Sequence, residues 1–190
     1  MASNADGVRG RDGKRWRTIA WGLAVALLVL PFVAMQFQTG VNWSPGDFIV
    51  FGMMIAAVGG GFELAVRASG SWAYRGGTAL ALAASFLTVW ANLAVGIVGD
   101  EHNPANLLFF AALLIGLVGS IGTQFRARGM AASTLATATA LLVAFGLAMI
   151  DRPDESGVNP GMELAGTGIF VALFLGSSAL FAKAARASGR

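Results

Sequence analysis

The polar side chains that could carry chemistry are concentrated in residues 90–106, which read W-A-N-L-A-V-G-I-V-G-D-E-H-N-P-A-N. Carboxylates, amides and an imidazole in such a cluster can coordinate a cation, relay a proton or hold a polar headgroup. The candidate ligand-binding residues in this stretch are Asn92, Asp100, Glu101, His102, Asn103 and Asn106. Because consecutive side chains point in different directions and Asn103 is placed to cap a helix, a solvated loop with a capped helix is the alternative interpretation.

Asn92 differs from the rest of the cluster because it falls within an apolar segment, residues 76–99. An amide inside a membrane helix either bonds to another helix or contacts a ligand. The spacing of Asn92, Gly96 and Gly99 predicts that the three share one helix face.

Glu63 is a further candidate site residue, one helical turn before Arg67 in another apolar segment. An i,i+4 ion pair that reaches towards the membrane surface explains this carboxylate without a function. A carboxylate within a membrane segment is also a functional candidate, here for a proton or a substrate.

The remaining composition excludes several kinds of site. The chain has no cysteine and one histidine, so it cannot form a disulfide, or a zinc site with ordinary nitrogen and sulfur ligands, within one chain. It contains no serine–histidine pattern, H-E-x-x-H motif or phosphate-binding glycine loop after a strand. We therefore expect a protein that is not an enzyme and that carries no cofactor.

The chain as a whole has the composition of a membrane protein. Of its 190 residues, 56% are hydrophobic and 12% charged, whereas a soluble domain carries roughly 25% charged residues. Six apolar segments are each close to the 20 residues that cross a bilayer, and they cover residues 18–36, 45–66, 76–99, 104–125, 131–150 and 162–182. The sequence therefore predicts an all-α, polytopic bundle of six transmembrane helices at residues 18–185, between a mobile basic tail (1–17) and a short C-terminus (186–190).

The charges predict the orientation of these spans. Cytoplasmic loops of membrane proteins are enriched in Lys and Arg. With both termini in the cytoplasm, 12 of the 13 basic residues lie on the inner side, and the formal charge is +9 inside and −6 outside. The basic residues are dispersed among loop ends, so they indicate topology and a lipid bilayer environment and do not indicate nucleic-acid binding.

Three of the predicted helices share the same start. A capping residue is followed by proline in Ser44-Pro45, Asn103-Pro104 and Asn159-Pro160. The side chain of the capping residue accepts a hydrogen bond from a free backbone N–H, and proline has no N–H to leave unsatisfied. The pattern indicates three tandem helical hairpins, although three independent proline caps would look the same.

The pattern W-x-N-L-A-V-G-I-x-G-x-E-x-N-P-A-N, which residues 90–106 carry, resembles a hairpin of small, uncharacterised multi-span inner-membrane proteins of bacteria. The resemblance covers about a tenth of the chain. It implies a bacterial inner membrane and carries over no catalytic residue.

These observations favour an accessory or sensor-like membrane protein that binds a partner or a small ligand at its outer hairpin mouths. The macromolecular partner would be another membrane protein or a second copy of the chain. The alternative is a small oligomeric transporter or channel for an ion or a small solute. Inverted repeats, which are typical of many transporters, are not evident in the sequence.

The charge asymmetry predicts the outcome of a labelling experiment. Single cysteines placed at Ser156 and Ser71 should respond oppositely to a membrane-impermeant thiol reagent added from outside, with labelling at 156 only. Labelling at 71 alone would reverse the orientation, and equal labelling of both would show a dual topology.

Overall fold

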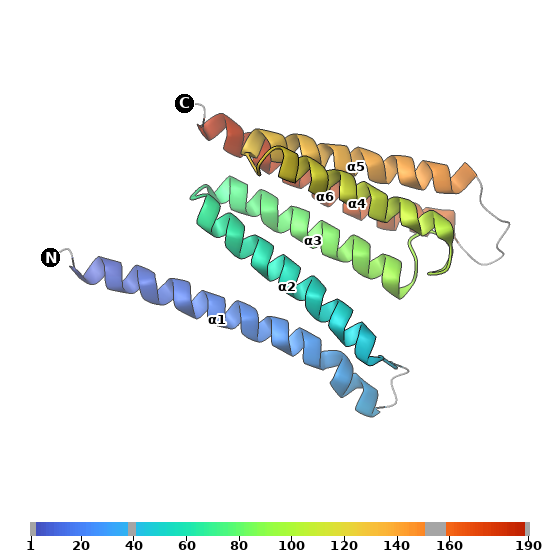
Figure 1. Ribbon diagram of the computed structural model, residues 1–190, viewed down its shortest axis with the longest axis horizontal. Coiled ribbons are helices and arrows are strands. Elements are labelled where there is room, and N and C mark those ends of the chain that lie inside the picture. The colour runs from blue at the N-terminus through green and yellow to red at the C-terminus, as the bar shows by residue number, and fades with distance from the viewer. Residues whose placement is uncertain (1–2, 38–40, 151–158, 189–190) are drawn as a thin grey trace. The chain divides into compact units, whose positions relative to one another are not determined.

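The computed structural model describes the backbone of residues 3–37, 41–150 and 159–188 (Figure 1). Within these ranges it describes the side chains from residue 17 onward. These residues form helices and connecting loops and no strand, which confirms the all-α prediction. The elements are α1 (Ser3–Ala34), η1 (Met35–Phe37), α2 (Pro45–Ala68), α3 (Trp72–Ala94), η2 (Pro104–Asn106), α4 (Leu107–Gly122), α5 (Ala127–Ile150) and α6 (Pro160–Ser188). Six segments are long and apolar enough to cross a membrane, so the protein is a multi-pass membrane protein.

Several helix boundaries differ from the predicted spans, most clearly those of α1, α3 and α6. α1 begins at Ser3, well before residue 18, and α6 continues to Ser188, six residues past its predicted end. α3 runs from Trp72 to Ala94 and so lies earlier in the chain than the predicted 76–99. The mobility of the tail at residues 1–17 and the separate C-terminus at residues 186–190 stay predictions. The charges counted at Asp151, Arg152, Asp154 and Glu155 lie outside the described residues.

The chain divides into two compact units, Met1–Gly60 and Gly61–Arg190. In the first unit, aromatic rings pack at the start of α2, where the Trp43 ring meets Phe48 and Phe51 edge-on at centroid distances of 5.1 and 5.3 Å. Further along, the Trp21 ring of α1 lies against Gly59 of α2, where an added Cβ would be 3.0 Å from the ring. Glycine therefore allows the aromatic ring to approach the backbone of α2.

In the second unit, α6 packs along both α3 and α5, and α4 packs along α5. Two serines of α6 bond to its two neighbours: Ser177 Oγ donates to the carbonyl of Gly77 at 2.7 Å, and Ser178 Oγ donates to that of Ala131 at 2.8 Å. The three predicted hairpins consequently differ in packing, because α5 lies along α6 whereas α3 and α4 share few direct contacts.

The interface of α4 with α5 depends on small residues. Gly116 faces the Thr137 hydroxyl closely, and an added Cβ on Gly119 would lie 2.7 Å from Ser133 Oγ. Glycines on a membrane helix let a second helix approach in this way.

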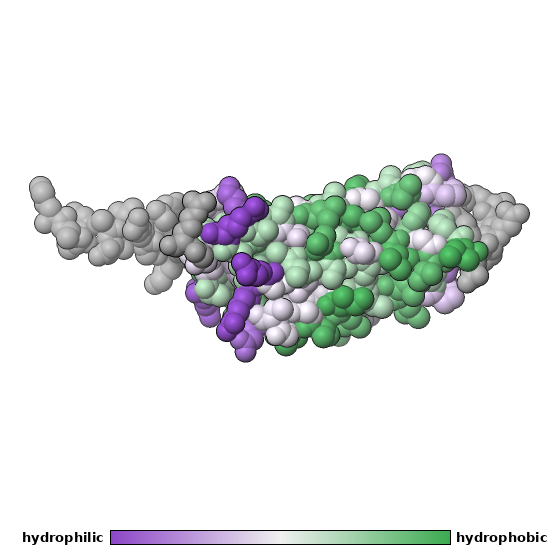
Figure 2. All heavy atoms as spheres, turned by 90° about the horizontal axis from the view of Figure 1, so that it is seen from above, coloured by the Kyte–Doolittle hydropathy of each residue, from purple (hydrophilic) through white to green (hydrophobic). Residues whose placement is uncertain are grey.

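The inside of the second unit is filled by side chains. Phe109, Leu141 and Phe181 are fully buried and come from α4, α5 and α6. Figure 2 shows hydrophobic residues along most of the visible coloured surface and strongly hydrophilic residues gathered towards one side. Exposed leucine, isoleucine and valine side chains on these helices are expected for segments whose solvent is lipid.

Candidate functional site

The site that the sequence predicted is built on the α3–α4 loop, residues 95–103, and on η2. α3 ends because Val95 leaves the helical conformation at φ −144°, and Gly96 and Gly99 then adopt left-handed φ values of 76° and 68°. A Cβ on Gly96 would collide with the carbonyl of Asp100, so the loop requires glycine there. The predicted helix face of Asn92, Gly96 and Gly99 is therefore wrong, since the two glycines lie outside the helix.

The loop folds around the side chain of Asn106, which is 5% exposed. Its Oδ1 accepts hydrogen bonds from the backbone N–H groups of Ile97 and Val98, both at 3.0 Å. Its Nδ2 donates to the carbonyls of Val98, at 3.2 Å, and of Asp100, at 2.7 Å. One amide thus satisfies four backbone groups where the helix has stopped supplying partners, which makes Asn106 a structural residue of the loop.

A carboxylate of another helix start fixes the same loop. Glu163, in the first turn of α6, accepts a hydrogen bond from the N–H of Gly99 through Oε1 at 2.8 Å. The loop and the start of α6 therefore converge. Asn159 instead caps its own helix by accepting from the N–H of Gly161 at 2.9 Å.

The remaining polar residues of the loop divide into two groups. Asn103 Oδ1 accepts from the N–H of Ala105 at 2.9 Å, and Asp100 Oδ1 accepts from the N–H of His102 at 2.9 Å. The Glu101 and His102 side chains are 50% and 84% exposed, and they contact each other, with Oε1 and Nδ1 3.6 Å apart. Asn103 and Asp100 thus hold the backbone of the loop, whereas the side chains of Glu101 and His102 are accessible on its surface.

Asn92 lies on the packed face of α3, 4% exposed and two residues from the end of the helix. Its Nδ2 donates to the carbonyl of Thr88, at 3.0 Å, in its own helix, so the interhelical hydrogen bond considered for this amide is not formed. Its Oδ1 and the Thr167 hydroxyl of α6 are buried and have no hydrogen-bond partner among the described residues. Both oxygens lie in the parts of α3 and α6 near the loop.

Glu63 is not part of this cluster. Its Oε2 pairs with Arg67 Nη2 at 3.2 Å, and the Arg67 side chain is 66% exposed. The predicted i,i+4 ion pair is confirmed. Because the Arg67 side chain is largely exposed to solvent, the pair should contribute little to the free energy of unfolding.

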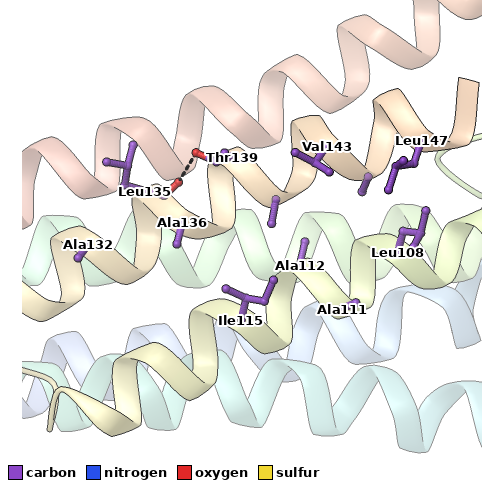
Figure 3. Close-up of a pocket in the computed structure, with 12 residues that line it drawn as sticks. Leu108, Ala111, Ala112, Ile115, Ala132, Leu135, Ala136, Thr139, Val143 and Leu147 are labelled. Carbon is purple, nitrogen blue, oxygen red and sulfur yellow. Dashed lines mark hydrogen bonds between the residues drawn. The ribbon is translucent and has the colours of Figure 1, made fainter.

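A groove of about 630 Å³ lies between α4 and α5, far more apolar than the loop (Figure 3). Alanine, leucine, isoleucine and valine side chains line it, and its polar group, the Thr139 hydroxyl, donates to the carbonyl of Leu135 at 3.1 Å. With that hydroxyl already bonded, the groove suits hydrocarbon. In the described part of the chain, no three His, Asp or Glu side chains are grouped closely enough to hold a metal ion.

Two residues that the sequence did not single out belong to the site. Glu163 lies in the first turn of α6, and its contact with Gly99 joins positions 64 residues apart, which no local pattern reveals. Thr167 lies one turn further along α6 in an apolar stretch and carried no signal.

Comparisons with protein-family models, with curated proteins and with solved structures found no match to this chain.

The geometry predicts that Asn106 is the most sensitive position of the loop. Replacing it with Ala leaves the N–H groups of Ile97 and Val98 buried without partners, so the free energy of unfolding should fall by at least about 2 kcal/mol. Asn106→Asp should also destabilise, because a carboxylate cannot donate to the carbonyls of Val98 and Asp100. Denaturation in mixed micelles measures both changes.

The matched control is Asn103→Ala, which removes one helix cap and should cost about 1 kcal/mol. If Asn106→Ala were no more destabilised than this control, the assignment of Asn106 as the organiser of the loop would be wrong.

Proposed function

We propose that the protein is a non-enzymatic accessory or sensor-like membrane protein that recognises a partner or a small ligand through Glu101 and His102. The proposal rests on the difference between two groups of polar residues in the loop. Asn106, Asn103 and Asp100 hold backbone groups, while the exposed Glu101 and His102 side chains contact each other. A rigid loop that presents exposed polar groups reduces the entropy lost on binding.

The packing of the second unit favours recognition over transport. Phe109, Leu141 and Phe181 fill interior positions of the described unit. The buried hydroxyls of Thr88, Thr137 and Ser177 already donate to backbone carbonyls, so they are not available to line a path for a solute. The groove between α4 and α5 is apolar and opens on the surface of membrane-spanning helices. A small oligomeric transporter or channel, the alternative function, would need its path at a surface between copies of the chain.

The same proposal includes the location. The +9 to −6 charge asymmetry supports both termini in the cytoplasm, with Glu101 and His102 on the outer side. The resemblance of residues 90–106 to a bacterial hairpin supports a bacterial inner membrane. The partner is then another membrane protein, a second copy of the chain or a small ligand at the outer surface.

The decisive variant is the double substitution Glu101→Ala, His102→Ala. Because both side chains are exposed and hold no backbone group of the described chain, the melting temperature in detergent should stay near that of the wild type. Chemical cross-linking in native membranes followed by purification should lose the adduct that the wild-type protein forms.

Asn103→Ala serves as the control with the opposite behaviour, since it weakens a helix cap and leaves both exposed side chains in place. It should lower the melting temperature and retain the adduct at low temperature. Unchanged cross-linking of the double variant would contradict the proposal. Ion or solute flux into proteoliposomes above that of empty vesicles would favour the transporter instead.

A further inference from the structure

The end of α6 carries a second surface with features of a binding site. A groove of about 510 Å³ is lined there by Ala179, Leu180, Lys183, Arg186 and Ala187. Lys183 and Arg186 are both exposed and lie one helical turn apart, so they point to the same side of α6. The groove therefore joins an apolar floor to a doubly basic rim.

The two positive charges lack a carboxylate partner in the described part of the chain. The Lys183 ammonium lies 4.4 Å from the centroid of the Trp72 ring, at the start of α3. Arg186 uses Nε to donate to the carbonyl of Ala182 at 3.3 Å, so the Nη groups of this exposed guanidinium are available to an anion. The ring holds the ammonium in place without neutralising it, so the rim is suited to an anion.

The position of the rim along the helix identifies the kind of anion. α6 has 29 residues and is about 43 Å long, whereas the hydrocarbon core of a bilayer is about 30 Å thick. The last turns of α6 therefore reach the headgroup layer. Trp72, which is 64% exposed beside Lys183, is the residue type that membrane proteins place at this depth.

We propose that this groove binds an anionic phospholipid, with its phosphate between Lys183 and Arg186 and an acyl chain along Ala179 and Leu180. Inorganic phosphate offers the same charge but would leave the apolar floor uncovered. The site is separate from the α3–α4 loop and lies at the opposite end of α6 from Glu163, so it does not depend on the proposed function.

Native mass spectrometry of the purified full chain tests the site with phosphatidylglycerol as the probe and phosphatidylcholine as the neutral comparison. The wild-type protein should retain phosphatidylglycerol preferentially. Each basic residue near a membrane surface contributes about 1 kcal/mol, or about fivefold in affinity, so Lys183→Gln, Arg186→Gln should weaken retention by more than tenfold.

The matched control is Arg126→Gln, Arg128→Gln, which removes the same charge from two exposed residues at the α4–α5 turn. It should retain phosphatidylglycerol like the wild type. Equal loss in both double variants would show general surface attraction and overturn the site. Displacement of the lipid by millimolar inorganic phosphate would show an anion site without lipid specificity, which would also overturn the proposal.

Discussion

A buried amide at the point where α3 stops is the constraint on which the α3–α4 connection depends. In a membrane protein, a helix supplies its own backbone hydrogen bonds, and a chain that leaves the helix near lipid must find others. Ile97 and Val98 are 6% and 1% exposed, so their N–H groups turn inward and cannot rely on water. Asn106 provides the acceptor for both, and the carboxylate of Glu163 provides one for Gly99.

This arrangement has a consequence for the packing of the second unit. A connection of nine residues with its own hydrogen bonds lets α4 leave α3 and pack along α5, while α3 packs along α6. A tight turn would instead have kept α3 and α4 side by side, as in an ordinary helical hairpin. Glu163 then ties the start of α6 to the loop, so three helix ends are held together by two side chains.

The three proline-capped helix starts show how one local pattern is used in different ways. At the start of α2, Asp47 bonds back to Ser44 at 2.7 and 2.9 Å and completes a reciprocal cap. At η2, Asn106 occupies a similar first-turn position but reaches back to the loop. At α6, Glu163 crosses to a different connection altogether. In all three, the residue before proline accepts a hydrogen bond from the helix that it caps. The polar residue in the first turn, by contrast, has a different partner in each.

These differences explain which features could be predicted from the sequence. Apolar length fixed the six helices, and spacing fixed the Glu63–Arg67 pair and the caps at Ser44, Asn103 and Asn159, because each depends on residues within a few positions. The end of α3 was placed five residues too late because Val95 to Gly99 are as apolar as the helix before them. An apolar run indicates that residues are buried but does not show whether they form a helix. Ile97 and Val98 are buried in a loop, where Asn106 supplies the hydrogen bonds that a helix would otherwise provide.

The site was predicted less well for a related reason. Residue types identified a polar cluster, but whether an amide binds a ligand or the chain's own backbone depends on contacts between distant positions. Asn106 and Asn103 proved to be structural, Asp100 accepts from the N–H of His102, and Asn92 bonds within its own helix. Glu101 and His102 are the candidates of this cluster whose exposed side chains hold no backbone group of the described chain.

Amide hydrogen exchange of the protein in lipid nanodiscs, followed by NMR, tests the role of Asn106 most directly. The N–H groups of Ile97 and Val98 should exchange as slowly as those in the middle of α3, although both residues lie outside any helix. The N–H of Glu101, an exposed residue of the same loop, provides the reference for rapid exchange. Exchange of Ile97 and Val98 as fast as that of Glu101 would contradict the account.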